Sequence, residues 1–278
     1  MSWRDRGVEI KTPEQVVAMR RAGLVVGRTL EVLRAAVRPG LSTRELDAIA
    51  EDAIRSAGAT PSFLGYQGFP ASICASVNDE VVHGIPGDRV LADGDLVSID
   101  CGAIVEGWHG DAAITVPVGT VREELLTLVA DTEAAMWAGI AAAHPGGRVG
   151  DISAAVEASL RRAGRYGILE DYTGHGIGTA MHQPPDVPNT GRAGRGARLV
   201  PGIALAVEPM VTLGGHRTDL LDDDWTVVTS DGSWAAHSEH TFALTERGAW
   251  VLTALDGGEE ALTRLGVPYG GEPTPVGD

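Results

Sequence analysis

Two apolar runs flank a short turn signal in residues 96–116, which read LVSIDCGAIVEGWHGDAAITV. Asp100 closes the first run and Asp111 opens the second. Apolar and β-branched runs separated by a glycine-containing turn are typical of paired antiparallel strands. We therefore expect a β-hairpin that turns near residues 105–107 and places Asp100 and Asp111 roughly opposite each other.

The two aspartates of this hairpin suggest a site. Neighbouring carboxylates repel each other, and their burial is costly unless a cation or hydrogen-bond donors compensate. A divalent metal would compensate strongly, whereas two exposed aspartates at strand ends are the plain alternative. Cys101 follows Asp100 in the same strand, so its side chain should point to the opposite face, into the core.

Helical and strand-like patterns continue on both sides of the hairpin. Thr12 with Gln15, and Ser42 with Glu45, fit the capping box that begins a helix. We predict helices at residues 13–37, 43–58, 121–143 and 151–163, and strands at residues 73–77, 96–100, 112–118, 204–207, 225–229 and 241–244. The order helices, strands, helices, strands indicates a fold with two similar halves.

A weak internal repeat supports the two halves. Residues 39–58 align with residues 145–164 at an offset of 106, and seven of the 20 positions are identical. We expect one domain spanning residues 1–278, with a core at about 12–252 and pseudo-symmetric halves near 12–118 and 121–252. A cleft between two such halves is a natural place for a site.

Two glutamates and one histidine stand in similar settings further along the chain. Glu208 follows the run at residues 204–207, and Glu239 precedes the run at residues 241–244. His175 lies between two glycines, and imidazole is a good ligand for transition metals. Each could be an ordinary strand-edge or loop residue. Together with the two aspartates they predict acids that converge on one interior dinuclear metal site.

The remaining histidines fall into two groups. His83 and His182 lie near turns and could bind or polarise a substrate amide beside a metal pair. The other five are expected to be structural or solvent-exposed: His109, His144, His216, His237 and His240.

Composition excludes several classes of protein. The chain has 278 residues and a formal net charge of −16, which argues against direct nucleic-acid binding. No apolar run approaches the roughly 20 residues of a membrane span. The polar N-terminus lacks the apolar stretch of a signal peptide, and two cysteines are too few for a disulfide framework. We therefore expect a cytoplasmic protein. Neither a Gly-x-Ser-x-Gly elbow nor a phosphate-binding loop occurs.

Seven short strings, in order along the chain, resemble type I methionine aminopeptidases. They are Gly65-Tyr66-Gln67-Gly68-Phe69-Pro70, Asn78 to Pro86, Asp95 to Asp100, Gly107-Trp108-His109-Gly110-Asp111, Thr173 to Gly178, Val207-Glu208-Pro209-Met210 and Ser238-Glu239-His240-Thr241. The resemblance runs from about Thr12 to Leu252. It implies the pita-bread fold, a pseudo-twofold α/β structure of the α+β type, in which helices cover an antiparallel sheet.

The resemblance also implies a metal site. It carries over five ligands for two divalent ions, drawn from manganese, iron(II), cobalt or zinc: Asp100, Asp111, His175, Glu208 and Glu239. Asp111 and Glu239 would bridge the ions. The implied activity is the hydrolytic removal of the initiator methionine from nascent proteins with small second residues, by a monomer that can associate with the ribosome.

Further roles follow from the same resemblance. Glu208 would shuttle a proton, His83 would face the scissile amide, and His182 would face the substrate carbonyl. The methionine pocket is expected among Tyr66, Phe69, Cys74, His83 and Trp225. Phe63, Gln67 and Phe69 depart from residues frequent in the family, which puts the width of the pocket in doubt. Two alternatives remain: a proline-specific peptidase of the same fold, and a non-enzymatic relative that binds peptides, proteins or RNA.

Overall fold

The predicted hairpin forms in the computed structural model, which describes residues 7–271. Strands β4 (Leu96–Val105) and β5 (Trp108–Pro117) pair from Leu96 opposite Pro117 to Val105 opposite Trp108. Glu106 and Gly107 make the turn, with φ angles of 51° and 82°. The register places Asp111 opposite Gly102 and Asp100 opposite Ala113. The two aspartates therefore share one face of the hairpin on a diagonal, not directly across from each other.

The helices and the other strands follow the predicted order. The helices are α1 (Pro13–Ala36), α2 (Thr43–Ser56), α3 (Glu123–Ala141), α4 (Val149–Ala163) and α5 (Glu259–Arg264), with a 3₁₀ turn at Tyr66–Gly68. The other strands are β1 (Thr60–Pro61), β2 (Ile73–Val77), β3 (Glu80–Val82), β6 (Gly167–Ile168), β7 (Gly174–Gly176), β8 (Gln183–Val187), β9 (Ala204–Val207), β10 (Met210–Thr212), β11 (Thr218–Leu220), β12 (Val227–Thr229), β13 (Ala235–His237), β14 (Glu239–Leu244) and β15 (Ala249–Val251). None of the helices described is long and apolar enough to cross a membrane.

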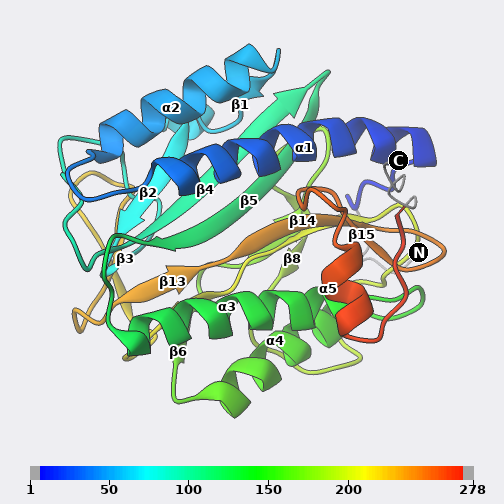
Figure 1. Cartoon of the computed structure of the whole chain (residues 1–278). Coiled ribbons are helices and arrows are strands. Elements are labelled where there is room, and N and C mark those ends of the chain that lie inside the picture. Colours follow the sequence, from blue (N-terminus) through cyan, green and yellow to red (C-terminus); the bar gives the residue numbers. More distant parts are fainter. Residues whose placement is uncertain (1–6, 272–278) are drawn as a thin grey trace.

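Nine strands form the main sheet. Its path is β1-β4-β5-β14-β9-β7-β8, with β2 added beside β4 and β15 beside β14, and its pairs are antiparallel. Helix α1 packs on β4 and β5, whereas α3 packs on β9, β13 and β14. Figure 1 shows α1 with α2 along one half of the sheet and α3 with α4 along the other. The expectation of an antiparallel sheet covered by helices is confirmed.

Hydrogen bonds repeat between the two halves, as the internal repeat predicts. The backbone N–H of Gly40 donates to the carbonyl of Leu91 at 2.8 Å, and that of Gly146 donates to Leu199 at 2.9 Å. Helices α2 and α4 begin three residues after these glycines: Ser42 and Glu45 form a full capping box at α2, and at α4 the backbone N–H of Arg148 donates to Asp151 in the same way as that of Ser42 does to Glu45. The shift that carries Leu91 onto Leu199 also carries the start of β4 onto the start of β9. The sheet is therefore pseudo-twofold, and its centre lies between β5 and β14.

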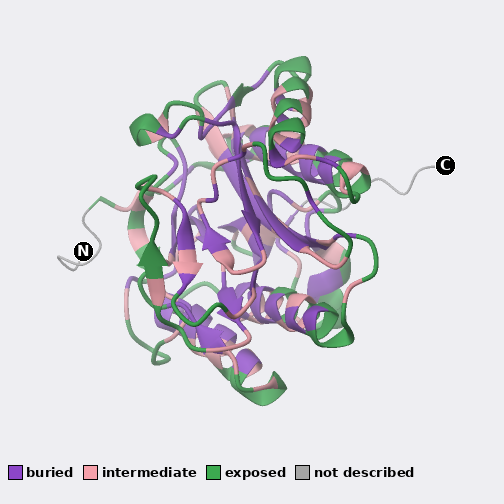
Figure 2. Cartoon of the chain, turned by 90° about the vertical axis from the view of Figure 1, so that its left-hand side faces the viewer, coloured by how far each residue is buried: buried purple, intermediate pink, exposed green. Residues whose placement is uncertain are grey.

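Successive side chains of β4 and β5 point alternately to the face of the sheet that the helices cover and to the face that carries the candidate site. Cys101 and Ala112 are fully buried, in one apolar cluster with Val26 and Leu33 of α1. Their neighbours Asp100 and Asp111 must then point to the other face of the sheet. Figure 2 shows strands that are mostly buried and helices exposed along their outer sides. Both cysteines have free thiols.

Four of the six predicted strands have different bounds in the structure. The two hairpin strands extend to their turn, so that the run at residues 96–100 continues to Val105 and the run at residues 112–118 begins at Trp108. The run at residues 225–229 forms a strand only from Val227, because Asp223 accepts hydrogen bonds from the backbone N–H groups of Trp225 and Thr226 in a tight turn. The run at residues 241–244 begins earlier, at Glu239, because this residue already pairs with Ala113 of β5. The earlier start of β14 places Glu239 inside the sheet.

Candidate metal centre

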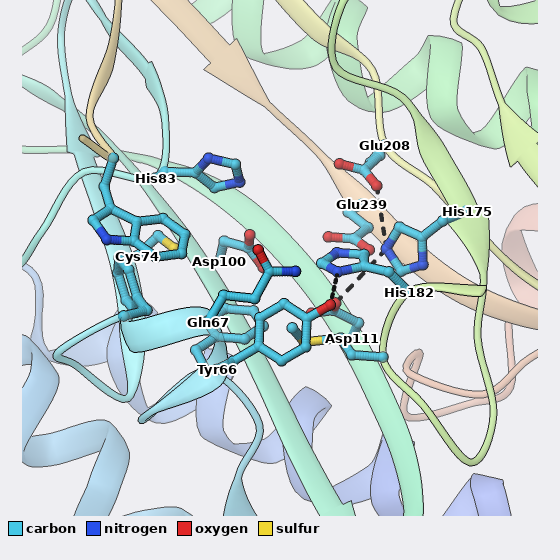
Figure 3. Close-up of a pocket in the computed structure, with 14 residues that line it drawn as sticks. Tyr66, Gln67, Cys74, His83, Asp100, Asp111, His175, His182, Glu208 and Glu239 are labelled. Atoms are coloured by element: carbon cyan, nitrogen blue, oxygen red, sulfur yellow. Dashed lines mark hydrogen bonds and ion pairs between the residues drawn. The ribbon is translucent and has the colours of Figure 1, made fainter. Parts of the chain in front are cut away.

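Five adjacent strands each contribute one of the predicted metal ligands. Asp100 lies on β4, Asp111 on β5, Glu239 at the start of β14 and His175 in the middle of β7, while Glu208 directly follows β9. These strands stand side by side in the order β4-β5-β14-β9-β7. Figure 3 shows the five side chains turned toward one place. The sheet thus gathers residues that are far apart in the sequence.

The polar atoms of this group lie close enough to share a cation. His175 Nε2 is 3.4 Å from Glu208 Oε1 and 3.9 Å from Asp111 Oδ2. Asp111, His175 and Glu239 each offer one ligand atom within a common 4.8 Å, and so do Glu208, His237 and Glu239. Carboxylate oxygens combined with imidazole nitrogen suit divalent first-row metals.

Three carboxylate oxygens in the group are buried without a hydrogen-bond partner among the described residues. They are Asp100 Oδ1, Asp111 Oδ1 and Glu239 Oε1. Buried polar atoms in folded proteins almost always have a partner, because an unsatisfied acceptor costs about 1–3 kcal/mol. Oxygens that point into a shared space with free lone pairs have the chemistry of metal ligands.

The raised pKa values of the four carboxyl groups also indicate a cation site. Burial raises the pKa of Asp100 to about 7. Burial, followed by the charges of Glu239 and Asp100, raises the pKa of Asp111 well above its ordinary value. The pKa values of Glu208 and Glu239 are raised well above theirs by burial and then by neighbouring carboxylates. Four carboxyl groups that resist ionisation together would be stabilised by positive charge among them.

His175 is held in the form that binds metals. Its Nδ1 lies 3.0 Å from the carbonyl oxygen of Gly176, so Nδ1–H donates there and Nε2 faces the carboxylates. Burial lowers the pKa of His175 to about 3, which keeps the imidazole neutral. A Cβ at Gly174 or Gly176 would collide with the backbone of a neighbouring strand. The flanking glycines therefore allow the close strand packing that brings His175 inward.

A small cavity of about 150 Å³ lies beside the carboxylates. All eleven residues predicted for the site line it, together with Phe63, Gln67 and Met181. The volume matches a cavity that holds a benzene molecule, so there is room for one medium-sized apolar side chain. The structure therefore brings the predicted ligands, the two predicted substrate-facing histidines and the predicted apolar residues to one place.

The apolar wall of the cavity is built from aromatic contacts. Phe69 and Trp225 meet edge to face, with ring centroids 5.0 Å apart. His83 follows β3 with φ of 60°, and its ring lies 6.1 Å from that of Trp225. Cys74 on β2 pairs in register with Asp100, which places the thiol at the border between the wall and the carboxylates. Burial lowers the pKa of His83 to about 4, so its ring is neutral.

His182 connects the wall to the metal ligands. Its ring centroid is 4.3 Å from that of His175, and its Nδ1 is 2.8 Å from the Tyr66 hydroxyl. Burial lowers the pKa of His182. Figure 3 shows the Tyr66 hydroxyl directed at this ring. Tyr66 therefore orients His182 in addition to lining the pocket.

His237 lies beside the candidate ligands although the sequence does not single it out. His237 was expected to be structural or exposed, yet it is only 1% exposed and its Nε2 lies 3.8 Å from Glu208 Oε2. Its position two residues before Glu239 in an extended segment was the available signal. His240 points to the helix side of the sheet, against Trp137, and His109 contacts Ser62. These two are structural.

The fold and the centre define a metal-dependent hydrolase. The sequence model of metallopeptidase family M24 matches residues 17–246, and the chain belongs to that family. Its fold is the pita-bread fold, as the resemblance in the sequence implied. Family and cluster together support binding of divalent metal.

Similar proteins include methionine aminopeptidases and, at lower identity, a prolidase. Methionine aminopeptidase 1 of Mycobacterium tuberculosis is 53% identical over 254 residues, covering 89% of this chain and 96% of the relative. The crystal structure of methionine aminopeptidase from Rickettsia prowazekii superposes with a TM-score of 0.87 at 39% identity, covering 88% of this chain and 99% of that one. Prolidase from Pyrococcus furiosus shares the fold, with a TM-score of 0.70 at 22% identity; the match covers 88% of this chain and 65% of the prolidase.

Proposed function

We propose that this chain is a methionyl aminopeptidase that removes the initiator methionine from new proteins, with a preference for small second residues. One observation carries the proposal: five candidate metal ligands from five adjacent strands meet at a cavity with room for one apolar side chain. The identity of about half to methionine aminopeptidase 1 over most of both chains supports it.

The residues fit a pair of divalent ions. Asp100, Asp111, His175, Glu208 and Glu239 would hold them, and Asp111 and Glu239 sit centrally enough to serve both. Bound divalent metals polarise a carbonyl and make water more acidic, which is the chemistry that amide hydrolysis needs. Manganese, iron(II), cobalt and zinc all accept such a donor set.

The apolar wall would select the first residue of the substrate. The aromatic rings of Phe69 and Trp225, with Cys74, form a surface that suits an unbranched thioether side chain. Phe63 and Gln67 at the same cavity would limit its width. Because the cavity has space for a single side chain, the substrate would bind by its terminal residue, with the rest of the peptide outside.

Three side chains would transfer the proton during hydrolysis and hydrogen-bond to the scissile amide of the substrate. Glu208 is only 12% exposed and lies beside the wall of the cavity, where its carboxylate can take up a proton from water and return it to the leaving amine. His83 is neutral and can accept or donate a hydrogen bond at the scissile amide. His182, with Nδ1 at the Tyr66 hydroxyl, can present Nε2–H to the substrate carbonyl oxygen.

The proposal extends to the whole molecule. Residues 12–252 would form one catalytic unit with pseudo-symmetric halves near 12–118 and 121–252. The protein would act as a monomer in the cytoplasm, on chains that emerge from the ribosome. Its net charge of −16 favours protein contacts over contact with ribosomal RNA for any such association.

A peptide assay with controlled metals tests this function. The protein is stripped of metal and incubated with Met-Ala-Ser, with and without manganese, iron(II), cobalt or zinc. Pro-Ala-Ser, Leu-Ala-Ser and Met-Phe-Ser serve as comparison peptides, and Asp111→Ala serves as the variant without a bridging ligand. We expect metal-dependent release of methionine, faster from Met-Ala-Ser than from Met-Phe-Ser, and almost none from the variant.

Other outcomes would replace the proposal. Release of proline in place of methionine would assign the chain to a proline-specific activity within the same fold. A folded protein that releases nothing with any of the four metals would point to a peptide-binding relative without turnover. Full activity of Asp111→Ala would contradict the assignment of the ligands.

A further inference from the structure

His237 lies at the junction between β13 and β14, the strand that carries Glu239. It is the last residue of β13, and Ser238 separates it from Glu239, the first residue of β14. In extended chain, residues two apart project to the same side. Glu239 faces the centre, so the imidazole of His237 is directed to the same region.

The backbone of His237 is fixed from two directions. Its N–H donates to Thr115 Oγ1 at 2.9 Å, and the Thr115 hydroxyl donates to the carbonyl of His237 at 2.8 Å. His237 also pairs in register with Met210, and the N–H of Ser238 donates to the carbonyl of Pro209 at 3.3 Å. Residues 209 and 210 directly follow Glu208. His237 is therefore tied to the hairpin and to the segment that carries Glu208.

Nitrogen Nε2 of the His237 imidazole faces Glu208, one of the candidate ligands. Nε2 is buried without a hydrogen-bond partner within residues 7–271 and lies 3.8 Å from Glu208 Oε2. The other oxygen of the same carboxylate, Oε1, is 3.4 Å from His175 Nε2. Glu208 thus stands between two imidazoles, one at each oxygen. A buried N–H without a partner is costly, and the nearby carboxylate is the acceptor within reach.

The cavity distinguishes the two imidazoles. His175, Glu208 and Glu239 are among the residues that line it, whereas His237 contacts Glu208 and Glu239 without being one of the lining residues. A small rotation that shortens the distance from Nε2 to Oε2 by about 1 Å would make an ordinary hydrogen bond. His237 can make this contact without entering the space where metal and substrate would be.

We propose that His237 is a positioning residue, whose Nε2–H donates to Glu208 Oε2 and so presents Oε1 to the metal site. This role rests on the proposed function. Carboxylates that bind metals are commonly held by such outer hydrogen bonds, and their loss typically weakens metal binding by about 10- to 100-fold. Direct ligation by His237 is the competing arrangement, because Glu208, His237 and Glu239 offer atoms within a common 4.8 Å.

Metal binding by the stripped protein separates these roles without any measurement of turnover. Wild type, His237→Ala, His237→Gln and the exposed control His144→Ala are titrated with manganese by calorimetry. Their cobalt-loaded absorption spectra and their melting temperatures without metal are recorded as well. Glutamine is the informative variant, because its Nε2 can donate to Glu208 but cannot reproduce imidazole ligation.

We expect His237→Ala to weaken manganese binding by about 10- to 100-fold, and His237→Gln to stay within about threefold of wild type. The cobalt spectrum of His237→Gln should match that of wild type, and the metal-free melting temperatures should agree. Wild-type affinity in His237→Ala would overturn the role. Equal weakening of manganese binding in both variants would also overturn the positioning role. A changed cobalt spectrum would then favour direct ligation by His237. Lower melting temperatures of the metal-free variants would favour a role in packing alone.

The wild-type titration keeps the two proposals apart. Wild-type protein that binds no metal would refute the proposed function, and the role of His237 with it. Metal binding by wild type that is unaffected in every variant would refute only the role of His237.

Discussion

The contact between Tyr66 and His182 sets the direction in which one imidazole of the cavity can donate. With the Tyr66 hydroxyl 2.8 Å from Nδ1, donation by the hydroxyl leaves the proton of the neutral ring on Nε2. We expect Tyr66→Phe to lower kcat/KM for Met-Ala-Ser by about five- to tenfold, since one hydrogen bond is worth about 1 kcal/mol. Steady-state kinetics over a range of peptide concentrations would measure the effect.

A matched control removes the same hydroxyl away from the cavity. Tyr166 donates to Asp131 at 2.6 Å, outside the lining of the cavity. Tyr166→Phe should leave kcat/KM for Met-Ala-Ser unchanged. Equal kinetics for Tyr66→Phe and wild type would show that the hydroxyl does not orient His182.

Single residues of this centre differ in how well the sequence predicts them. Asp100 and Asp111 adjoin apolar runs, and His175 stands between glycines, so local sequence reveals them. His237 carries no comparable mark. Its environment depends on Glu208, a residue in another strand, and on Thr115 of the hairpin. Contacts between distant segments leave no trace in the pattern around either residue.

Among the elements, helix α1 depends on an unusually close approach to the chain after β15. A Cβ at Gly23 would overlap the carbonyl of Leu252, and one at Gly110 on β5 would lie 2.7 Å from the backbone nitrogen of Gly23. We expect Gly23→Ala to lower the free energy of unfolding by about 1–3 kcal/mol through overpacking. Denaturant titration would measure the change.

Whether Gly23→Ala lowers or raises the free energy of unfolding distinguishes overpacking from helix propensity, because alanine favours the helix over glycine by about 1 kcal/mol. Arg28→Ala, at an exposed position of the same helix, should change stability by less than about 0.5 kcal/mol. A Gly23→Ala protein that is more stable than wild type would show that α1 can move away from the chain after β15 without cost.

The carboxylate of Asp231 joins the loop after β10 to the loop before β13, and its pKa is lowered by these contacts. Hydrogen bonds from Ser233, and then from the backbone N–H of Gly215, lower the pKa of Asp231 to about 2. The stabilisation is complete above the unfolded value near 4 and is lost as pH falls through 2. At pH 6 we expect Asp231→Asn to cost about 1 kcal/mol, after allowance for solvent screening.

Chemical unfolding at pH 6 and pH 3 would test this dependence. The difference between wild type and Asp231→Asn should shrink at pH 3, because the unfolded wild-type chain then binds a proton that the folded chain does not. Asp219→Asn, at an exposed position on β11, should show no such change. A difference for Asp231→Asn that is the same at both pH values would contradict the assigned cause.

At the scale of the whole molecule, the repeat predicts more of the fold than any single motif does. Residues 39–58 and 145–164 become equivalent turns and helices with matching hydrogen bonds to the chain near Leu91 and Leu199. The pairing of β5 with β14 at the centre of the sheet could not be predicted. It joins segments more than a hundred residues apart, and side-chain alternation within either strand is compatible with several neighbours.

This central pairing concentrates four carboxyl groups, and the molecule should therefore be less stable without metal. Binding of metal at 100 times its dissociation constant stabilises the folded state by about 2.7 kcal/mol. For a chain of this size we expect a chelator to lower the melting temperature by about 5–10 °C. Scanning fluorimetry with EDTA, followed by excess manganese, would show the loss and its recovery.

The crowding of these four carboxyl groups predicts that a variant lacking one of them is more stable than wild type when no metal is bound. Asp111 is 3% exposed and lies among Asp100, Glu208 and Glu239. Without metal, Asp111→Asn removes a charge that costs desolvation and repulsion, so the variant should melt above metal-free wild type. With manganese the order should reverse, because the variant would lack one of the proposed ligands. If Asp111→Asn were the less stable protein in both states, hydrogen bonding within the fold, and not a metal, would be what these carboxyl groups are arranged for.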